Sequence, residues 1–174
     1  MQGQLSQKER MLLEDLKQSE NLCVVKYQSY AQQAKDSQLS QLFNTIAGQE
    51  QEHYDTVNQL LQSGGQAQSG QSGGQQKGQS GGQSGNQSGQ QKPGGAQSAA
   101  QINLSQGAGS SSDKYLLQDM LTTEKQISSA YDTSVFESGN TNVRQALQHI
   151  QQEEQNHGEQ IFQYMSSHGM YQQQ

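Results

Sequence analysis

The sequence predicts an all-α protein: a four-helix bundle built from two repeated αα-hairpins, joined by a long Gly/Gln/Ser-rich linker. In two segments, apolar residues recur every three or four positions, the period of an amphipathic helix. Residues 12–61 align without a gap to residues 116–165, so that Glu20 corresponds to Glu124. Helical hairpins bury their apolar faces by packing on one another, which a duplicated hairpin can do within one chain.

The linker is expected over residues 63–112, between an N-terminal hairpin (residues 1–62) and a C-terminal hairpin (residues 113–171). Units such as SGGQ and SGNQ recur in it, with almost nothing apolar to bury. This composition favours a flexible connection, long enough to run the length of a bundle. A Gln/Gly/Ser tract can also self-associate through its side-chain amides, so a tether and an assembly element both remain open.

The first two helices are expected over residues 5–36 and 38–62, with a break and an N-cap at Asp36-Ser37. The inward stripe of the first helix is Leu13, Leu16, Glu20, Cys23, Tyr27, Tyr30 and Ala34. That of the second helix is Leu39, Leu42, Ile46, Glu50, His53, Val57 and Leu60. Acidic and His residues therefore replace apolar side chains in the middle of each stripe, although charged groups are rarely buried without a partner.

The other two helices are expected over residues 113–138 and 142–168. Ser112-Asp113 is the expected N-cap of the third helix, Gly139-Asn140 its end, and Thr141 the cap of the fourth. The inward residues of the third helix are Leu117, Met120, Glu124, Ile127, Tyr131 and Val135. Those of the fourth are Val143, Leu147, Ile150, Glu154, His157, Ile161 and Tyr164.

Each hairpin carries a Glu-x-x-His motif and a lone glutamate upstream of it. A Glu and a His three residues apart share one helix face, so both can bind the same metal ion. The six candidate ligands are Glu20, Glu50, His53, Glu124, Glu154 and His157. Two Glu and two Glu-x-x-His form the ligand set of ferritin-like dinuclear carboxylate sites. Because each comes from a Glu-x-x-His helix, Glu50 and Glu154 are the expected bridging ligands.

The alternative is that the six side chains pair with one another without a metal. Several carboxylates would then have to be desolvated side by side, at a cost that a dication removes. A dinuclear metal is therefore favoured, iron or manganese, with zinc as a further candidate. Tyr27 and Tyr131 lie two turns after the lone glutamates, and they are either core aromatics or hydrogen-bond donors that hold a ligand carboxylate.

Composition excludes several classes of function. The net charge of -6 argues against nucleic acid and anionic membranes as main partners. We expect no membrane span, because no apolar stretch is long enough, and no secretory signal in MQGQLSQKERM. Cys23 is the single cysteine, which leaves no intramolecular disulfide and no Cys-based zinc or iron–sulfur site.

The stretches YLLQDMLTTEKQISSAYDTSVFES and NVRQALQHIQQEEQNHGEQIFQYMSSHGMY resemble the Coat F family, spore coat proteins of endospore-forming Firmicutes. The resemblance covers about residues 113–171 and implies a ferritin-like fold. The N-terminal half is similar to a rubrerythrin-like hairpin. Two departures are the Gly/Gln/Ser insert and the lack of a Cys-rich rubredoxin-like module, which removes the electron path of a full rubrerythrin.

The resemblance implies a structural or assembly protein of the spore coat, made in the mother-cell cytoplasm and not secreted. Its partners would be other spore coat proteins, and a homo-oligomer is a further expectation. The ligand set supports an alternative, a di-iron or di-manganese redox protein that removes peroxide or oxygen or stores metal. Enzymatic activity is left open by the sequence, and the two classes are compatible.

Overall fold

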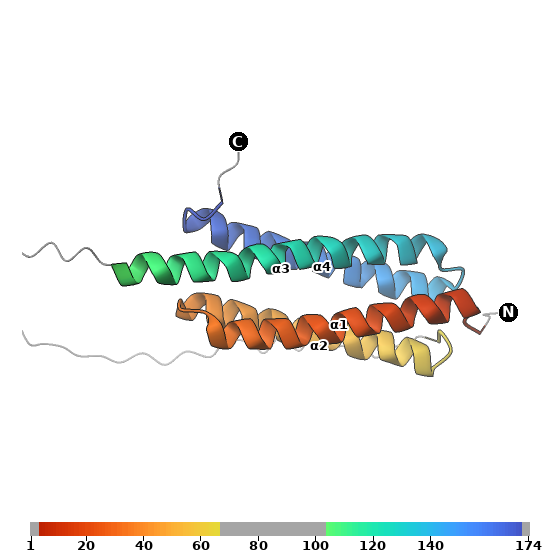
Figure 1. Ribbon diagram of the computed structural model, residues 1–174. Coiled ribbons are helices and arrows are strands. Elements are labelled where there is room, and N and C mark those ends of the chain that lie inside the picture. Colours follow the sequence, from red (N-terminus) through yellow and green to blue (C-terminus); the bar gives the residue numbers. More distant parts are fainter. Residues whose placement is uncertain (1–3, 67–103, 172–174) are drawn as a thin grey trace, which may run out of the picture. The chain divides into compact units, whose positions relative to one another are not determined.

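The computed structural model describes residues 4–66 and 104–171. Within these residues it contains four helices: α1 (Gln7–Gln33), α2 (Ser37–Gln62), α3 (Leu104–Glu137) and α4 (Thr141–Ser167). All four belong to one compact unit, which confirms the predicted all-α bundle of two hairpins (Figure 1). The predicted linker falls mostly on residues 67–103, which lie outside the described residues.

Helices α1 and α3 run antiparallel along the bundle (Figure 1). At one end, Lys8 near the start of α1 forms an ion pair with Glu137 at the end of α3. At the other end, the carboxylate of Asp113 in α3 accepts hydrogen bonds from the backbone N–H groups of Lys35 and Asp36, just after α1. Helix α2 therefore ends at the opposite end of the bundle from the start of α3, as a long crossover connection requires.

Side-chain caps fix the start of three helices. Ser6 caps α1 in a capping box with Glu9. Asp36 caps α2, as predicted, since its Oδ1 accepts from the N–H groups of Gln38 at 2.6 Å and Leu39 at 3.2 Å. Helix α4 is capped by Asn140, whose side chain accepts from two backbone N–H groups of the first turn. The predicted cap Thr141 is instead the first residue of that helix.

Helix α3 begins at Leu104 and not near residue 113, so the predicted N-cap at Ser112-Asp113 is wrong. Asp113 does accept backbone hydrogen bonds, but its donors belong to the turn between α1 and α2, at 2.9 and 3.0 Å. A carboxylate that satisfies the free N–H groups of a distant turn looks in sequence like a cap of its own helix.

The same contact occurs at the other end of the bundle. Glu9, the counterpart of Asp113 in the duplicated hairpin, accepts from the backbone N–H of Asn140 at 2.8 Å. Asn140 is in turn the counterpart of Asp36. The first helix of each hairpin thus holds the turn of the other, and the duplication extends beyond the aligned segments.

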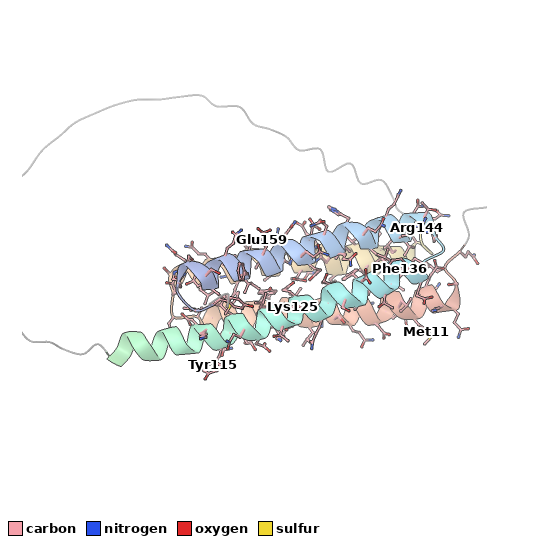
Figure 2. The ribbon with its side chains drawn as sticks, turned by 90° about the horizontal axis from the view of Figure 1, so that it is seen from above. Met11, Tyr115, Lys125, Phe136, Arg144 and Glu159 are labelled. Atoms are coloured by element: carbon pink, nitrogen blue, oxygen red, sulfur yellow. The ribbon has the colours of Figure 1, made fainter. Side chains whose placement is uncertain are left out.

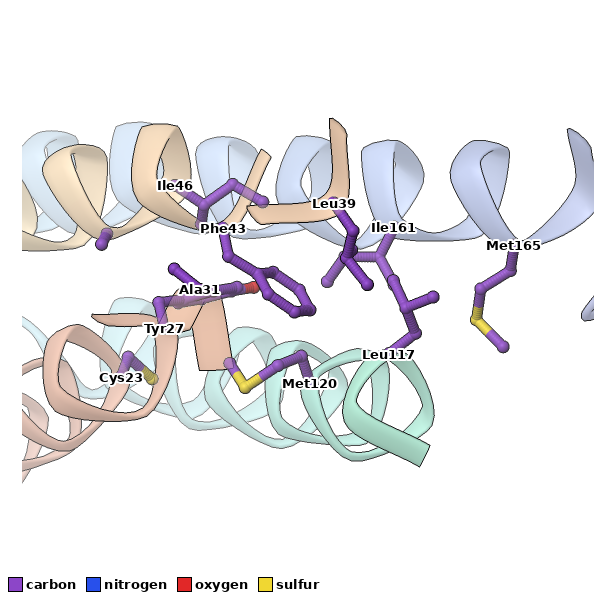
Figure 3. Close-up of a cluster of buried hydrophobic side chains, with 11 residues drawn as sticks. Cys23, Tyr27, Ala31, Leu39, Phe43, Ile46, Leu117, Met120, Ile161 and Met165 are labelled. Atoms are coloured by element: carbon purple, nitrogen blue, oxygen red, sulfur yellow. The ribbon is translucent and has the colours of Figure 1, made fainter. Parts of the chain in front are cut away.

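The apolar core forms two clusters, one toward each end of the bundle. The first contains Cys23, Tyr27, Ala31, Leu39, Phe43, Ile46, Ala47, Leu117, Met120, Ile161 and Met165 (Figure 3). The second contains Leu5, Leu13, Leu16, Val57, Leu60, Tyr131, Val135, Val143, Leu147 and Ile150. Along α1, Glu20 lies between Leu16 of the second cluster and Cys23 of the first. The candidate ligands therefore occupy a polar layer between two apolar ones.

The predicted inward stripes are largely confirmed. Leu13, Ile46 and Ile161 are buried, and Cys23 is a small buried side chain whose thiol pKa is raised by burial. Ile127 is half-buried and contacts both clusters. Phe43 was not predicted to face inward but is fully buried, since the buried face of α2 is wider than a single stripe.

Candidate metal centre

The six acidic and imidazole side chains singled out from the sequence meet in the middle of the bundle, one from each of α1 and α3 and two from each of α2 and α4. All six are at most 3% exposed. They form two overlapping groups whose ligand atoms lie within 4.8 Å of one another. The groups are Glu20, Glu50, His53 and Glu154, and Glu50, Glu124, Glu154 and His157. The two groups share Glu50 and Glu154, the pair expected to bridge.

Each tyrosine holds the lone glutamate of the other hairpin. The Tyr27 hydroxyl on α1 donates to Glu124 Oε1 on α3, and the Tyr131 hydroxyl on α3 donates to Glu20 Oε1 on α1. Burial first, and then the neighbouring glutamate, raises the pKa of both phenols well above its usual value, so that they stay protonated donors. Of the two open interpretations, these hydrogen bonds favour the positioning of a ligand carboxylate.

The imidazoles cross between the hairpins in the same reciprocal way. His53 Nδ1 lies 2.9 Å from Glu154 Oε1, and His157 Nδ1 lies 3.0 Å from Glu50 Oε1. The two rings stack with their centroids 5.4 Å apart. Both Nδ1 atoms thus point toward the shared carboxylates, as metal ligation through this nitrogen would require.

The Nε2 atoms of the two imidazoles have different surroundings, although the Nδ1 atoms are related by the repeat. His53 Nε2 lies 3.0 Å from Glu153 Oε2, whereas His157 Nε2 is buried without a hydrogen-bond partner among the described residues. The counterpart of Glu153 in the duplicated hairpin is Gln49, whose Oε1 is buried and also lacks a partner there. Sequence reasoning missed Glu153. The available signal was a glutamate directly before the second Glu-x-x-His motif, where the first repeat has Gln49.

Burial and interactions with neighbouring charges shift the pKa values of the acidic and imidazole side chains in the polar layer. Burial, and then Glu50, raises the pKa of Glu20 and of Glu124 to about 7. Burial opposes charge on Glu50 too, but the imidazoles of His157 and His53 outweigh it and lower its pKa to about 2. The imidazole of His53 is opposed by burial as well, yet the surrounding carboxylates, Glu154 foremost, raise its pKa to about 12. Burial also raises the pKa of Glu154, to about 10. The four glutamates of the layer therefore cannot all ionise without a compensating cation.

The donor set fits a pair of divalent cations. One oxygen, Oε2, of each of the four glutamates is buried without a hydrogen-bond partner among the described residues. Such atoms are rare in a folded protein and call for an ion or a water. Carboxylates with imidazoles suit iron, manganese or zinc. The arrangement indicates the class of the protein: a ferritin-like bundle whose buried carboxylates and imidazoles form two overlapping groups, consistent with a dinuclear metal site.

Comparison with known families agrees with this class. Residues 12–78 match the Rubrerythrin family model, and residues 112–174 match that of the Coat F domain. A search of curated proteins and one of solved structures found no match. The first match covers the N-terminal pair of helices and the second covers most of the C-terminal pair, which confirms both resemblances. In the part that the structure describes, no helix has the length and apolarity of a membrane span.

Proposed function

We propose that this protein is a structural or assembly component of the spore coat whose bundle retains a dinuclear metal centre. The Coat F match over residues 112–174 carries the coat assignment. The surface is rich in Gln, which agrees with a protein that associates with other coat proteins through side-chain amides. In this proposal it is made in the mother-cell cytoplasm and deposited on the spore.

We further propose the ligand roles within the centre. Glu50 and Glu154 bridge the two metal positions, because they alone belong to both groups of ligand atoms. His53 completes one position with Glu20, and His157 completes the other with Glu124. Tyr27 and Tyr131 hold the two outer carboxylates through their hydroxyl groups. The bound metal stabilises the bundle by neutralising the crowded carboxylates.

Fractionation of spores tests the coat assignment. Immunodetection in sporulating cells of the organism that makes this protein should find the protein in the mother cell and then in the coat extract of purified spores. A variant with Glu50 and Glu154 both changed to Gln should reach the coat as well, since assembly in this proposal depends on the surface. Detection only in the cytoplasm of vegetative cells would contradict the coat role.

The complete ligand set and the rubrerythrin match favour a second candidate, a di-iron or di-manganese redox protein. An iron or manganese pair would supply one-electron chemistry toward peroxide or oxygen. Elemental analysis of protein purified without added metal, followed by a peroxide-consumption assay, separates the candidates. Turnover of peroxide that the Glu50→Gln variant loses would support the redox role, and metal without turnover would support the structural one.

Glu153 should make the metal position at His53 the stronger of the two. A carboxylate that accepts from the outer N–H of a ligand imidazole fixes its tautomer, and its loss typically costs about 10- to 100-fold in metal affinity. We expect Glu153→Ala to weaken one of the two Mn²⁺-binding steps by about that factor in a calorimetric titration. The matched control is Gln49→Ala at the counterpart position, which should change neither step. Equal weakening of both steps by Glu153→Ala would contradict this asymmetry.

The sequence of the connection should matter for association and not for folding. Replacing residues 68–103 by a Gly/Ser sequence of equal length keeps the length of chain that connects the two hairpins. We expect the melting temperature to stay within a few degrees and the self-association measured by light scattering to fall. An unchanged oligomer distribution would reduce the segment to a tether, and unfolding would show that it packs on the core.

A further inference from the structure

A groove of about 610 Å³ lies over α3 and α4. Glu124 and Glu154, two of the candidate ligands, lie on its lining. Lys125 on α3 and Glu159 on α4 lie at its exposed rim, on the side of the bundle that Figure 2 presents. The buried carboxylates are thus adjacent to a solvent-facing hollow on this side of the bundle.

Gly158 keeps this groove open. It lies on α4 four residues after Glu154, on the same helix face. A Cβ atom at this position would lie 3.8 Å from Glu124 Cβ and 3.9 Å from Leu121 Cδ1, which is ordinary contact. A methyl group would therefore fit, whereas a large side chain would extend over the groove.

The duplicated hairpin has a large side chain at the counterpart position, Tyr54 on α2. The Tyr54 ring lines a smaller groove over α1 and α2, beneath the ammonium of Lys17 at 5.9 Å from the ring centroid. The other lining residues of that groove are Gln18, Asn21, Leu22 and Val25. None of the six candidate ligands is among the residues that line it. Access to the centre therefore differs between the two halves of the repeat.

The two grooves also differ in the charged residues that line them, and this difference again favours the groove over α3 and α4 as the route for a cation. The exposed rim of the groove over α3 and α4 carries two acidic residues, Asp132 and Glu159, and one basic residue, Lys125. The groove over α1 and α2 is lined by Lys17 and by no acidic side chain. An acidic hollow raises the local concentration of cations, and a basic one lowers it.

We propose that the groove over α3 and α4 is the passage by which hydrated divalent cations reach the centre, and that Gly158 holds it open. The proposal rests on the proposed metal centre and adds its route of loading. Asp132 and Glu159 at the rim attract the cation, and Glu124 and Glu154 receive it. The Tyr54 side chain closes the equivalent route on the other face.

The test is the rate of Mn²⁺ uptake by the full chain, followed as the loss of the free-ion signal in electron paramagnetic resonance. Gly158→Tyr, which copies the counterpart residue, should slow uptake at least about tenfold and leave the final number of bound ions unchanged. Gly158→Ala is the matched control and should load at the wild-type rate. Glu159→Lys should slow uptake several-fold at low salt, and Asp55→Lys, at the counterpart position on α2, should not.

The outcomes separate the passage from the centre. Wild-type protein that takes up no Mn²⁺ would overturn the centre and the passage together. Wild-type protein that loads, with Gly158→Tyr loading equally fast, would overturn the passage alone. If Gly158→Tyr fails to fold, the test is the comparison of Mn²⁺ uptake rates between Glu159→Lys and Asp55→Lys, since both substituted residues are exposed. Equal rates for these two variants would overturn the passage, and slowing only by Glu159→Lys would support it.

Discussion

Substitution of Glu50 or Glu154 by alanine is expected to remove both metal ions, whereas His53→Ala should weaken chiefly one. Each bridging carboxylate belongs to both groups of ligand atoms, while His53 belongs to one. Elemental analysis after loading with Mn²⁺ or Fe²⁺ should give two ions for the wild type, none for either Glu variant and about one for His53→Ala.

Glu52→Ala is the matched control, because Glu52 lies within the same Glu-x-x-His motif on α2 but is exposed. It should leave two ions bound. Retention of both ions by Glu154→Ala would contradict the bridging assignment, and loss of both by Glu52→Ala would point to binding elsewhere.

Metal is expected to raise the melting temperature of the wild type by about 10 °C or more. A ligand at about 1,000 times its dissociation constant stabilises the native state by about 4 kcal/mol, and 1 kcal/mol shifts a domain of this size by a few degrees. Calorimetry of the apo protein with and without Mn²⁺, Fe²⁺ or Zn²⁺ measures the shift and ranks the metals. A melting temperature that changes with none of the three metals would refute the proposal of a metal centre.

The apo protein should become less stable as the pH rises from about 5 to about 8. The pKa of Glu20 and Glu124 is raised from 4.5 to about 7, so the folded state holds protons that the unfolded state has released. Stability from these groups is complete below pH 4.5 and is lost as the pH rises through about 7. The raised pKa of His53 acts in the same sense above its ordinary value.

Metal binding should reverse this dependence, because it requires the same carboxylates to be deprotonated. The gap between the melting temperatures of the loaded and apo proteins should therefore widen as the pH rises across this range. Thermal melts at three pH values, with the Glu50→Gln variant as a control for metal bound elsewhere, measure the gap. A gap that narrows with rising pH would contradict the assignment of carboxylates as the ligands.

The fold and the six candidate ligands could be predicted because they depend on periodicity and duplication. A glutamate in the middle of an apolar stripe is visible in sequence, and its recurrence at the same repeat position argues against chance. The Coat F and rubrerythrin resemblances followed from the same motifs. Helix period alone then placed Glu20, Glu124 and the two motifs in one layer of the bundle.

Contacts between the hairpins could not be predicted in this way. Asp113 accepts from backbone groups far away in sequence, and nothing local distinguishes it from an N-cap. Glu153 contacts His53 across the bundle, although it looks like a solvated neighbour of a ligand. The beginning of α3 at Leu104 was missed because the Gly and Ser residues of its first turns have a low helix propensity.

The reciprocal contacts between the hairpins have a consequence for assembly. Glu9 and Asp113 hold the turns, and Tyr27 and Tyr131 hold the outer carboxylates, each acting from one hairpin on the other. None of these contacts depends on the two hairpins being consecutive in one chain. An N-terminal hairpin can close equally well on the C-terminal hairpin of a neighbouring molecule, and repeated exchange of this kind produces an open string of bundles. Each metal pair in such a string would be a cross-link between chains, and chelation would remove it.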